Sequence, residues 1–190
     1  MSSGSIEKDS LLVLRPASSN GLPTGTKNMI EAATPASPKD YFIEALSGER
    51  LAIARAIVHI YISGTTLSAG TYGNKTALTN GILLTYRKSG VLLNVTDGLP
   101  IKKQEDWGRI AYDARPVGPY GAAGNQFPFW QVRLTFTRFG NPYGIVLEEG
   151  DRLGVRLQDD LSTGEISEHY IHFEGVHIGI PNPTWQSPIT

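Results

Sequence analysis

The sequence contains no cysteine, so neither a disulfide framework nor a thiolate metal site can hold the fold together. Lysine and arginine total 17 against 18 acidic residues, and no basic run forms a stripe that would neutralise phosphates. The apolar run at residues 11–14 is far too short for a signal sequence or a membrane span. We therefore expect a protein made in the cytoplasm that binds neither nucleic acid nor membrane and is stabilised by its core or by oligomerisation.

Motifs for nucleophilic catalysis and phosphate binding are also missing. There is no Gly-x-Ser-x-Gly elbow, and the glycines at 118, 121 and 124 precede no Lys-Ser or Lys-Thr pair. We expect a protein that is not an enzyme and uses no cofactor. An enzyme with an unfamiliar site stays open as an alternative, and its mark would be the convergence of His59 with Glu148 or Asp159.

Metal ligands are few and unsuitably spaced. His169 and His172 have opposite parity in one predicted strand, so they point to opposite faces of a sheet. His169 and His177 share parity but lie about 26 Å apart along an extended strand. The carboxylates at 148–151 and at 159–160 lack the spacing of a calcium loop and are typical of turns. We expect no metal site.

Twenty-one glycines and 12 prolines favour strands joined by many turns over a helical bundle. Between residues 40 and 180, short apolar runs recur at spacings typical of an all-β, antiparallel β-sandwich. The run 49–63 opens with alanines that could make a helical turn, but its β-branched and aromatic residues at 57–62 favour a strand, so we expect mainly a strand. Ser89-Gly90 predicts a tight hairpin between two apolar runs. Alternation in 130–136 and in 153–157 predicts strands with one wet face. One short helix is expected between 100 and 112, with Trp107 capping the core, and 115–128 is expected to be a long irregular loop.

Residues 1–39 and 181–190 are rich in small polar residues and proline, and we expect them to form extended N- and C-terminal arms. Two apolar islands in the first segment favour docking, because a purely solvating tail has no use for them. Two aromatic residues on the predicted loop and tail are further contact candidates, either for a protein or for a sugar ring. The predicted assembly contacts are Leu11, Leu12, Val13, Leu14, Met29, Ile30, Tyr120 and Trp185.

Three stretches resemble known proteins: LEEGDRLGVRLQDDLS at 147–162, HYIHFEGVHIG at 169–179 and EDWGRIAYD at 105–113. The first two are similar to the C-terminal half of jelly-roll domains that assemble as trimers. The third, with the Asp-Asp-Leu turn, is similar to small proteins encoded near the capsid genes of tailed bacteriophages, some of which are head decoration or cement proteins. The resemblance spans 105–179 and transfers no functional residue.

This resemblance implies a jelly-roll-like structural protein of the virion that sits on the capsid surface. Its partners would be the major capsid protein and two further copies of itself in a trimer, with residues 1–39 reaching the shell or a neighbouring copy. Two alternatives stay open. One is another phage part, such as a neck, baseplate or minor capsid protein, and the other is a carbohydrate-binding or receptor-binding β-sandwich.

Overall fold

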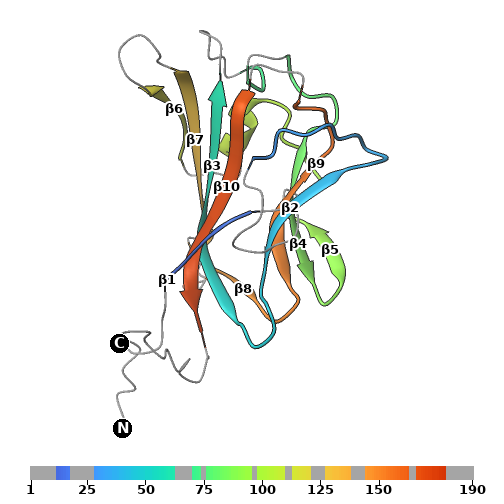
Figure 1. Ribbon diagram of the computed structural model, residues 1–190, viewed down its shortest axis with the longest axis vertical. Coiled ribbons are helices and arrows are strands. Elements are labelled where there is room, and N and C mark those ends of the chain that lie inside the picture. Colours follow the sequence, from blue (N-terminus) through green and yellow to red (C-terminus); the bar gives the residue numbers. More distant parts are fainter. Residues whose placement is uncertain are drawn as a thin grey trace, which may run out of the picture.

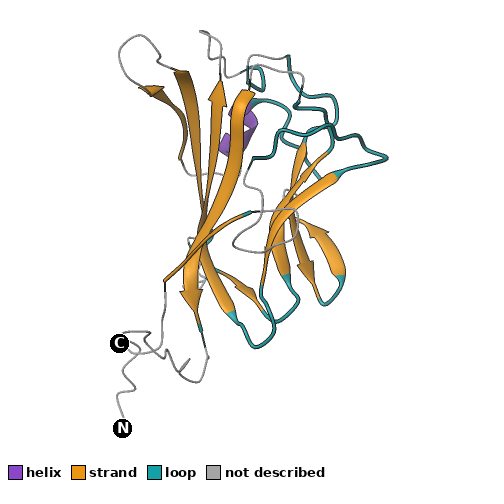
Figure 2. Ribbon diagram, in the orientation of Figure 1, coloured by secondary structure: helices purple, strands orange, loops and turns teal. Residues whose placement is uncertain are grey.

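The computed structural model describes residues 12–17, 28–62, 70–73, 76–95, 98–109, 113–120, 127–137, 144–162 and 166–178. Two antiparallel sheets face each other across one core, as Figure 1 and Figure 2 show. The described chain is therefore an all-β sandwich, which confirms the fold class expected from the turn-rich composition.

The larger sheet has six strands in the order β1-β10-β3-β7-β6, and β8 also pairs with β3. Its strands are β1 (Leu12–Pro16), β3 (Leu51–Ile62), β6 (Asp113–Tyr120), β7 (Phe127–Thr135), β8 (Ile145–Leu147) and β10 (Ile166–His177). The smaller sheet has the order β2-β9-β4-β5, with β2 (Lys39–Glu44), β4 (Ile82–Lys88), β5 (Val91–Asn94) and β9 (Arg152–Leu157).

Strand pairs nest inside one another along the chain. The outermost pair is β1 with β10, the next is β2 with β9, then β3 with β7 and β8, and the innermost is the hairpin of β4 and β5. Successive pairs fall alternately in the larger and the smaller sheet. The most distant parts of the described sequence thus lie side by side, and β5 is left at the free edge of the smaller sheet (Figure 1).

The core forms where the inward faces of the two sheets meet. In β7, Trp130, Val132 and Leu134 are buried while Arg133 between them is exposed, which confirms the predicted alternation. The β9 side chains at 153, 155 and 157 are buried in the same way. The largest fully buried side chains include Trp107, Tyr41, Tyr72, Phe173, Met29, Ile43, Leu51, Ile53, Ile60, Ile62, Ile82 and Leu84.

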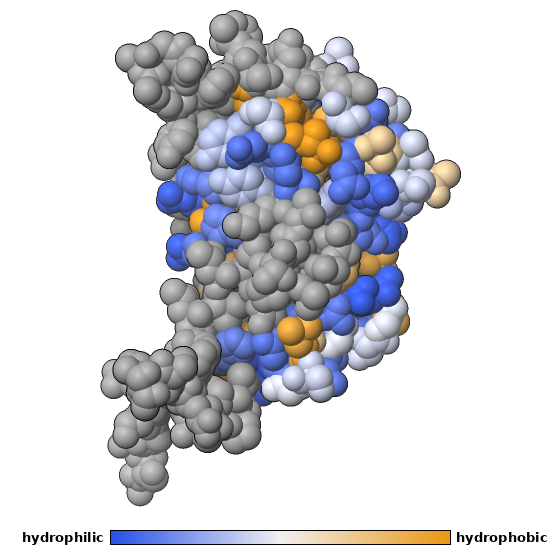
Figure 3. All heavy atoms as spheres, in the orientation of Figure 1, coloured by the Kyte–Doolittle hydropathy of each residue, from blue (hydrophilic) through white to orange (hydrophobic). Residues whose placement is uncertain are grey.

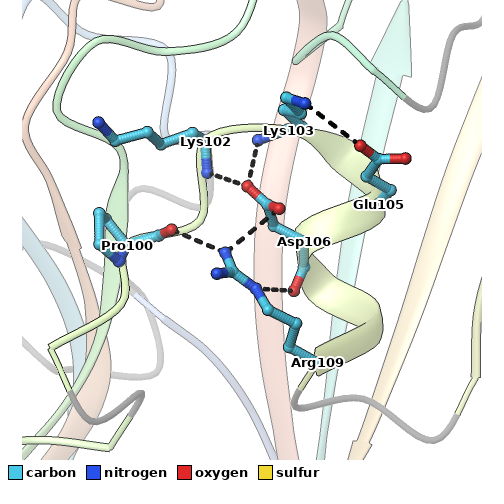
Figure 4. Close-up of polar contacts among 6 residues, drawn as sticks. All are labelled: Pro100, Lys102, Lys103, Glu105, Asp106 and Arg109. Atoms are coloured by element: carbon cyan, nitrogen blue, oxygen red, sulfur yellow. Dashed lines mark hydrogen bonds and ion pairs between the residues drawn. The ribbon is translucent and has the colours of Figure 1, made fainter.

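The predicted short helix is a 3-10 helix, η2 (Gln104–Arg109), and it places Trp107 fully inside the core. Asp106 holds its start, because one carboxylate oxygen accepts hydrogen bonds from the backbone N–H groups of Lys102 (2.8 Å) and Lys103 (2.9 Å), as Figure 4 shows. Arg109 pairs with the same carboxylate at 3.2 Å. No helix among the described residues is long and apolar enough to cross a membrane.

The segment expected to be an irregular loop at 115–128 is largely a strand pair. Residues 113–120 form β6, which pairs with β7 and ends the six-stranded sheet. Prolines at 116 and 119 suggested a loop, but a strand at a sheet edge tolerates proline because only alternate N–H groups are needed for pairing. Residues 121–126 lie outside the described part of the chain.

The described part of the expected N-terminal arm packs against the chain's own domain. Strand β1 pairs with β10, and the backbone N–H of Met29 donates to the carbonyl of His169 at 2.6 Å. Met29 and Ala33 are buried, and Lys39 already begins β2. The backbone of β1 and the side chain of Met29 are thus both part of the sandwich to which they are tethered. The expected C-terminal tail, 181–190, lies outside the described residues.

Candidate assembly surface

The β4–β5 hairpin and the segment after it expose most of the large apolar side chains found on the described surface. We call this group the β5 patch: Val91 (60% exposed), Leu92 (40%), Leu93 (47%), Val95 (40%) and Leu99 (56%). On the face drawn in Figure 3 the described residues are mainly hydrophilic, and apolar residues gather only in small groups. Within β5, Leu92 lies on the same face as Arg87, whereas Val91 and Leu93 lie on the other face. Exposed apolar residues gathered in one short segment are typical of interaction sites.

Two residues in the left-handed region of backbone conformation form the turn of the hairpin. Ser89 has a φ of 48° and Gly90 a φ of 83°, as a two-residue type I′ turn requires. The buried carboxylate of Asp151 accepts a hydrogen bond from the Ser89 N–H at 3.0 Å and another from the Glu148 N–H at 3.1 Å. The tip of the hairpin is therefore fastened to the turn between β8 and β9.

The outer face of the four-stranded sheet carries two ion pairs between β2 and β9. Arg156 donates two hydrogen bonds to Asp40, at 2.7 and 2.8 Å, and this pairing raises the pKa of Arg156. Arg152 donates to Glu44 at 2.9 Å, and its guanidinium carbon lies 4.5 Å from the centre of the Phe42 ring. The β2 edge of the sheet is therefore covered by matched charges.

A shallow groove runs across this face towards β5. In β9 of the same sheet, a Cβ added at Gly154 would clash with the backbone carbonyl oxygen of Tyr41. Only glycine fits this close approach between β9 and β2. The lining residues are Asp40, Phe42, Thr85, Arg87, Leu92, Arg152 and Val155.

On the outer face of the six-stranded sheet, aromatic rings stack on one another. The ring of His59 lies 4.8 Å from that of Tyr170 and 5.4 Å from that of His172, and the rings of Tyr61 and Tyr170 are 6.0 Å apart. Burial, together with nearby His172 and Arg133, lowers the pKa of His59 to about 4. His59 is therefore neutral at pH 7.

The inner face of the same sheet holds a buried polar contact. The Tyr72 hydroxyl and the Nε2 atom of His169 are 3.0 Å apart. Burial lowers the pKa of His169 to about 3 and raises that of Tyr72. His169 faces the core while His172 lies on the outer face, which confirms the strand parity expected from the sequence. Among the described residues, no three metal-ligating side chains converge.

The acidic side chains near β8 and β9 form ion pairs and hydrogen bonds that hold the surrounding turns. Glu148 pairs with Arg50 at 2.7 Å, and Glu149 accepts a hydrogen bond from the Gly48 N–H at 3.0 Å. Asp159 accepts from the backbone N–H groups of residues 79–81. Because Arg50 precedes the first residue of β3, Glu148 lies at the opposite end of that strand from His59, roughly 26 Å away. The convergence of His59 with Glu148 that would have marked an unfamiliar active site is not formed.

The residues predicted from the sequence as assembly contacts lie in different parts of the structure. In β1, Leu12, Val13 and Leu14 pair with β10. Met29 is buried in the core, and Ile30 packs against it. Tyr120 ends β6 and pairs with Phe127. The two remaining candidates, Leu11 and Trp185, lie outside the described residues.

Sequence reasoning missed the β5 patch, although one signal was present. The run at 91–93 has three apolar residues with no polar alternation directly after a tight turn. In a strand with one wet face, alternate residues are polar. A short apolar run without this alternation at a sheet edge therefore predicts exposed apolar side chains.

Comparison of the chain with family models, with curated proteins and with solved structures finds no match.

Proposed function

We propose that the chain is a structural virion protein that decorates the outside of a tailed-bacteriophage head and stabilises it through contacts with the major capsid protein. The observation that carries this proposal is the β5 patch, an exposed apolar surface on a sandwich whose core is otherwise well packed. Such a surface is unfavourable in water and gains free energy when a partner covers it.

The strand order supports the same proposal. Nested pairing of β1 with β10, β2 with β9, β3 with β7 and β8, and β4 with β5 is the connectivity that a jelly roll would have, with two Greek keys shared between two sheets. Jelly rolls recur in viral capsid domains, although the same fold serves other functions. The strand order is therefore consistent with the resemblance to jelly-roll domains, but a fold alone does not indicate a function.

Particle labelling tests this function. Antibody raised against the purified chain would be applied to phage particles released from the source culture, and gold particles would be counted on heads, necks and tails by electron microscopy. Label on the head surface is expected. Label confined to necks or baseplates would overturn the proposed site in favour of another phage part, and particles without label would overturn the virion assignment.

We further propose that the protein forms a trimer, because decoration proteins of this kind occupy symmetry axes. Light scattering coupled to size exclusion would measure the native mass. A value near three times the 20.6 kDa chain is expected. A mass that stays at 20.6 kDa over a hundredfold range of concentration would contradict the trimer and leave the head-labelling result to decide the function.

A further inference from the structure

The register of the smaller sheet determines which side chains share its outer face. Leu92 of β5 stands opposite Arg87 of β4, and Arg87 stands opposite Arg152 of β9. Residues paired in this way project on the same side of a sheet, whereas Leu93, the next residue of β5, projects on the other side. One residue of the β5 patch, Leu92, therefore lies beside arginines on the outer face.

The charges of this outer face do not balance among the described residues. Its arginines are Arg87, Arg152 and Arg156, and its carboxylates are Asp40 and Glu44. Arg152 pairs with Glu44 at 2.9 Å. Arg156 pairs with Asp40 at 2.7 Å. The remaining arginine, Arg87, forms no hydrogen bond or ion pair within the described part of the chain, so the face carries one cation in excess.

Arg87 is only partly exposed, and a second cation stands opposite it in the register. Partial burial takes water away from the guanidinium, so its charge is less well solvated than that of a fully exposed arginine. Like charges directly opposite each other in a sheet are also unfavourable. A carboxylate beside Arg87 would offset both costs.

The shallow groove on this face offers space for that carboxylate. Arg87 and Leu92 line it together with Phe42 and Thr85. The groove holds about 310 Å³ of empty space, including space open to solvent. Pockets that enclose a whole small ligand typically hold about 300–1,000 Å³. A groove at the lower end of that range and open to solvent fits a single side chain better than a whole small ligand.

We propose that this groove binds one acidic side chain of a partner polypeptide, whose carboxylate pairs with Arg87 while an adjacent apolar side chain of the partner covers Leu92. Charge complementarity favours a protein as the partner. One excess cation matches one carboxylate, whereas a nucleic acid presents a row of phosphates. A free small carboxylate would leave Leu92, which is 40% exposed, uncovered. This inference rests on the proposed function only in taking the partner to be another protein.

Peptide binding to the full chain tests the proposal. The probes are a capped tripeptide with glutamate between two leucines, its glutamine and lysine counterparts, and acetate. Nuclear magnetic resonance would follow the methyl groups of Leu92 and the side-chain N–H of Arg87. We expect both signals to shift with the glutamate peptide, which should bind at least about fivefold more tightly than any other probe. This preference should shrink in concentrated salt, which screens the ion pair.

Two pairs of variants separate the charge from the apolar contact. Arg87→Gln should make the affinities for the glutamate and glutamine peptides equal. Its control is Arg133→Gln, which removes an exposed arginine from the other sheet and should keep the preference. Leu92→Ala should weaken the binding of both peptides by about three- to tenfold. Its control is Leu93→Ala, which shortens a leucine on the opposite face of β5 and should leave both affinities unchanged.

Several results would overturn the proposal. They are equal affinity for the glutamate and lysine peptides, shifts centred away from Arg87 and Leu92, or no saturable binding at millimolar peptide. Acetate that binds as tightly as the glutamate peptide, with no dependence on Leu92, would overturn the assignment to a polypeptide. A native mass that falls with Arg87→Gln, in the absence of any peptide effect, would assign the groove to a second copy instead.

Head labelling is independent of these measurements. Peptide binding without head label would leave the groove as a carboxylate site and remove only the virion assignment. Head label without peptide binding would remove only the carboxylate site.

Discussion

The β4–β5 hairpin differs from the rest of the sandwich, called the body here, in the pairing of its charged side chains and the exposure of its apolar ones. In the body, Asp40 and Glu44 meet the guanidinium groups of Arg156 and Arg152, and the histidine and tyrosine rings of the larger sheet stack on one another. In the hairpin, three consecutive apolar side chains are exposed, and Arg87 has no counter-charge among the described residues. Charged and aromatic side chains of the body thus contact one another, whereas the hairpin has exposed apolar side chains and a cation without a described counter-charge.

Under the proposed function, this difference makes the hairpin the expected contact region. A surface whose groups already pair with one another gains little from a partner. Exposed apolar side chains and a cation without a described counter-charge would gain apolar burial and an ion pair. The most informative experiments therefore make the same kind of substitution in the body and in the hairpin and compare the effects.

The largest difference is expected from shortening one apolar side chain in each region. Ile43→Ala in β2 leaves a cavity in the core, where Ile43 is fully buried, and should lower the free energy of unfolding by about 2–5 kcal/mol. Leu93→Ala in β5 removes a side chain that is nearly half exposed and should lower it by less than about 0.5 kcal/mol. Urea unfolding followed by tryptophan fluorescence measures both. Equal losses of unfolding free energy would mean that Leu93 contributes as much to stability as a core residue, contrary to the comparison.

Acid should weaken the body. The unfolded chain binds a proton at His169 near pH 6.5, whereas the native state binds one only near pH 3. Between these values the unfolded state holds more protons, so stability falls as the pH falls, by about 1.4 kcal/mol per pH unit for this residue. Unfolding free energies at pH 7, 6, 5 and 4 should fall at least this steeply below pH 6.5, because the lowered pKa of His59 contributes in the same direction, and His169→Gln should reduce the slope.

His177→Gln is the control for this measurement, because His177 lies at the end of the same strand and is partly exposed. The pair of variants compares the loss of a buried histidine with the loss of a partly exposed one on the same strand. A wild-type slope that His169→Gln does not alter would show that the buried contact with Tyr72 is not the source of acid sensitivity.

The sequence predicted the body better than the hairpin, and the reason is physical. Apolar and polar residues alternate over 130–134 because one face of β7 is buried, so the two-residue period of a strand can be seen in the sequence. Ser89-Gly90 predicted its turn because few residues accept positive φ. Such signals are local and can be read from a short stretch of chain.

What the sequence did not predict depends on neighbours that are distant in the chain. The prolines of β6 were read as a loop, since nothing local shows that the strand lies at an edge. The exposure of β5 arises because no described strand lies beyond it. Among the described residues Arg87 lacks a counter-charge because the register gives Glu44 to Arg152, and that register couples residues 108 positions apart. Pairing choices of this kind are properties of the folded sheet.

A smaller effect is expected from the charges on the outer face. Asp40 and Arg156 form a two-bond pair that is partly exposed, so their coupling energy should be about 0.3–1 kcal/mol and should shrink in 0.5 M salt, an ionic strength of roughly that size leaving a Debye length under 5 Å. A double-mutant cycle with Asp40→Asn and Arg156→Gln measures it. The same cycle with Arg87→Gln in place of Arg156→Gln should give a coupling near zero, and a larger value there would show that Arg87 already has a partner.

A similarly small effect is expected at the turn of the β4–β5 hairpin. Ser89 holds a φ of 48°, which asparagine adopts more readily than serine and a β-branched residue adopts poorly. Ser89→Asn should therefore raise the unfolding free energy by up to about 0.5 kcal/mol, while Ser89→Val should lower it by about 1 kcal/mol. Both variants keep the backbone N–H that donates to Asp151, so the turn stays fastened to the body. If the two variants unfold at the same urea concentration, the turn contributes nothing to the cooperative unfolding of the sandwich.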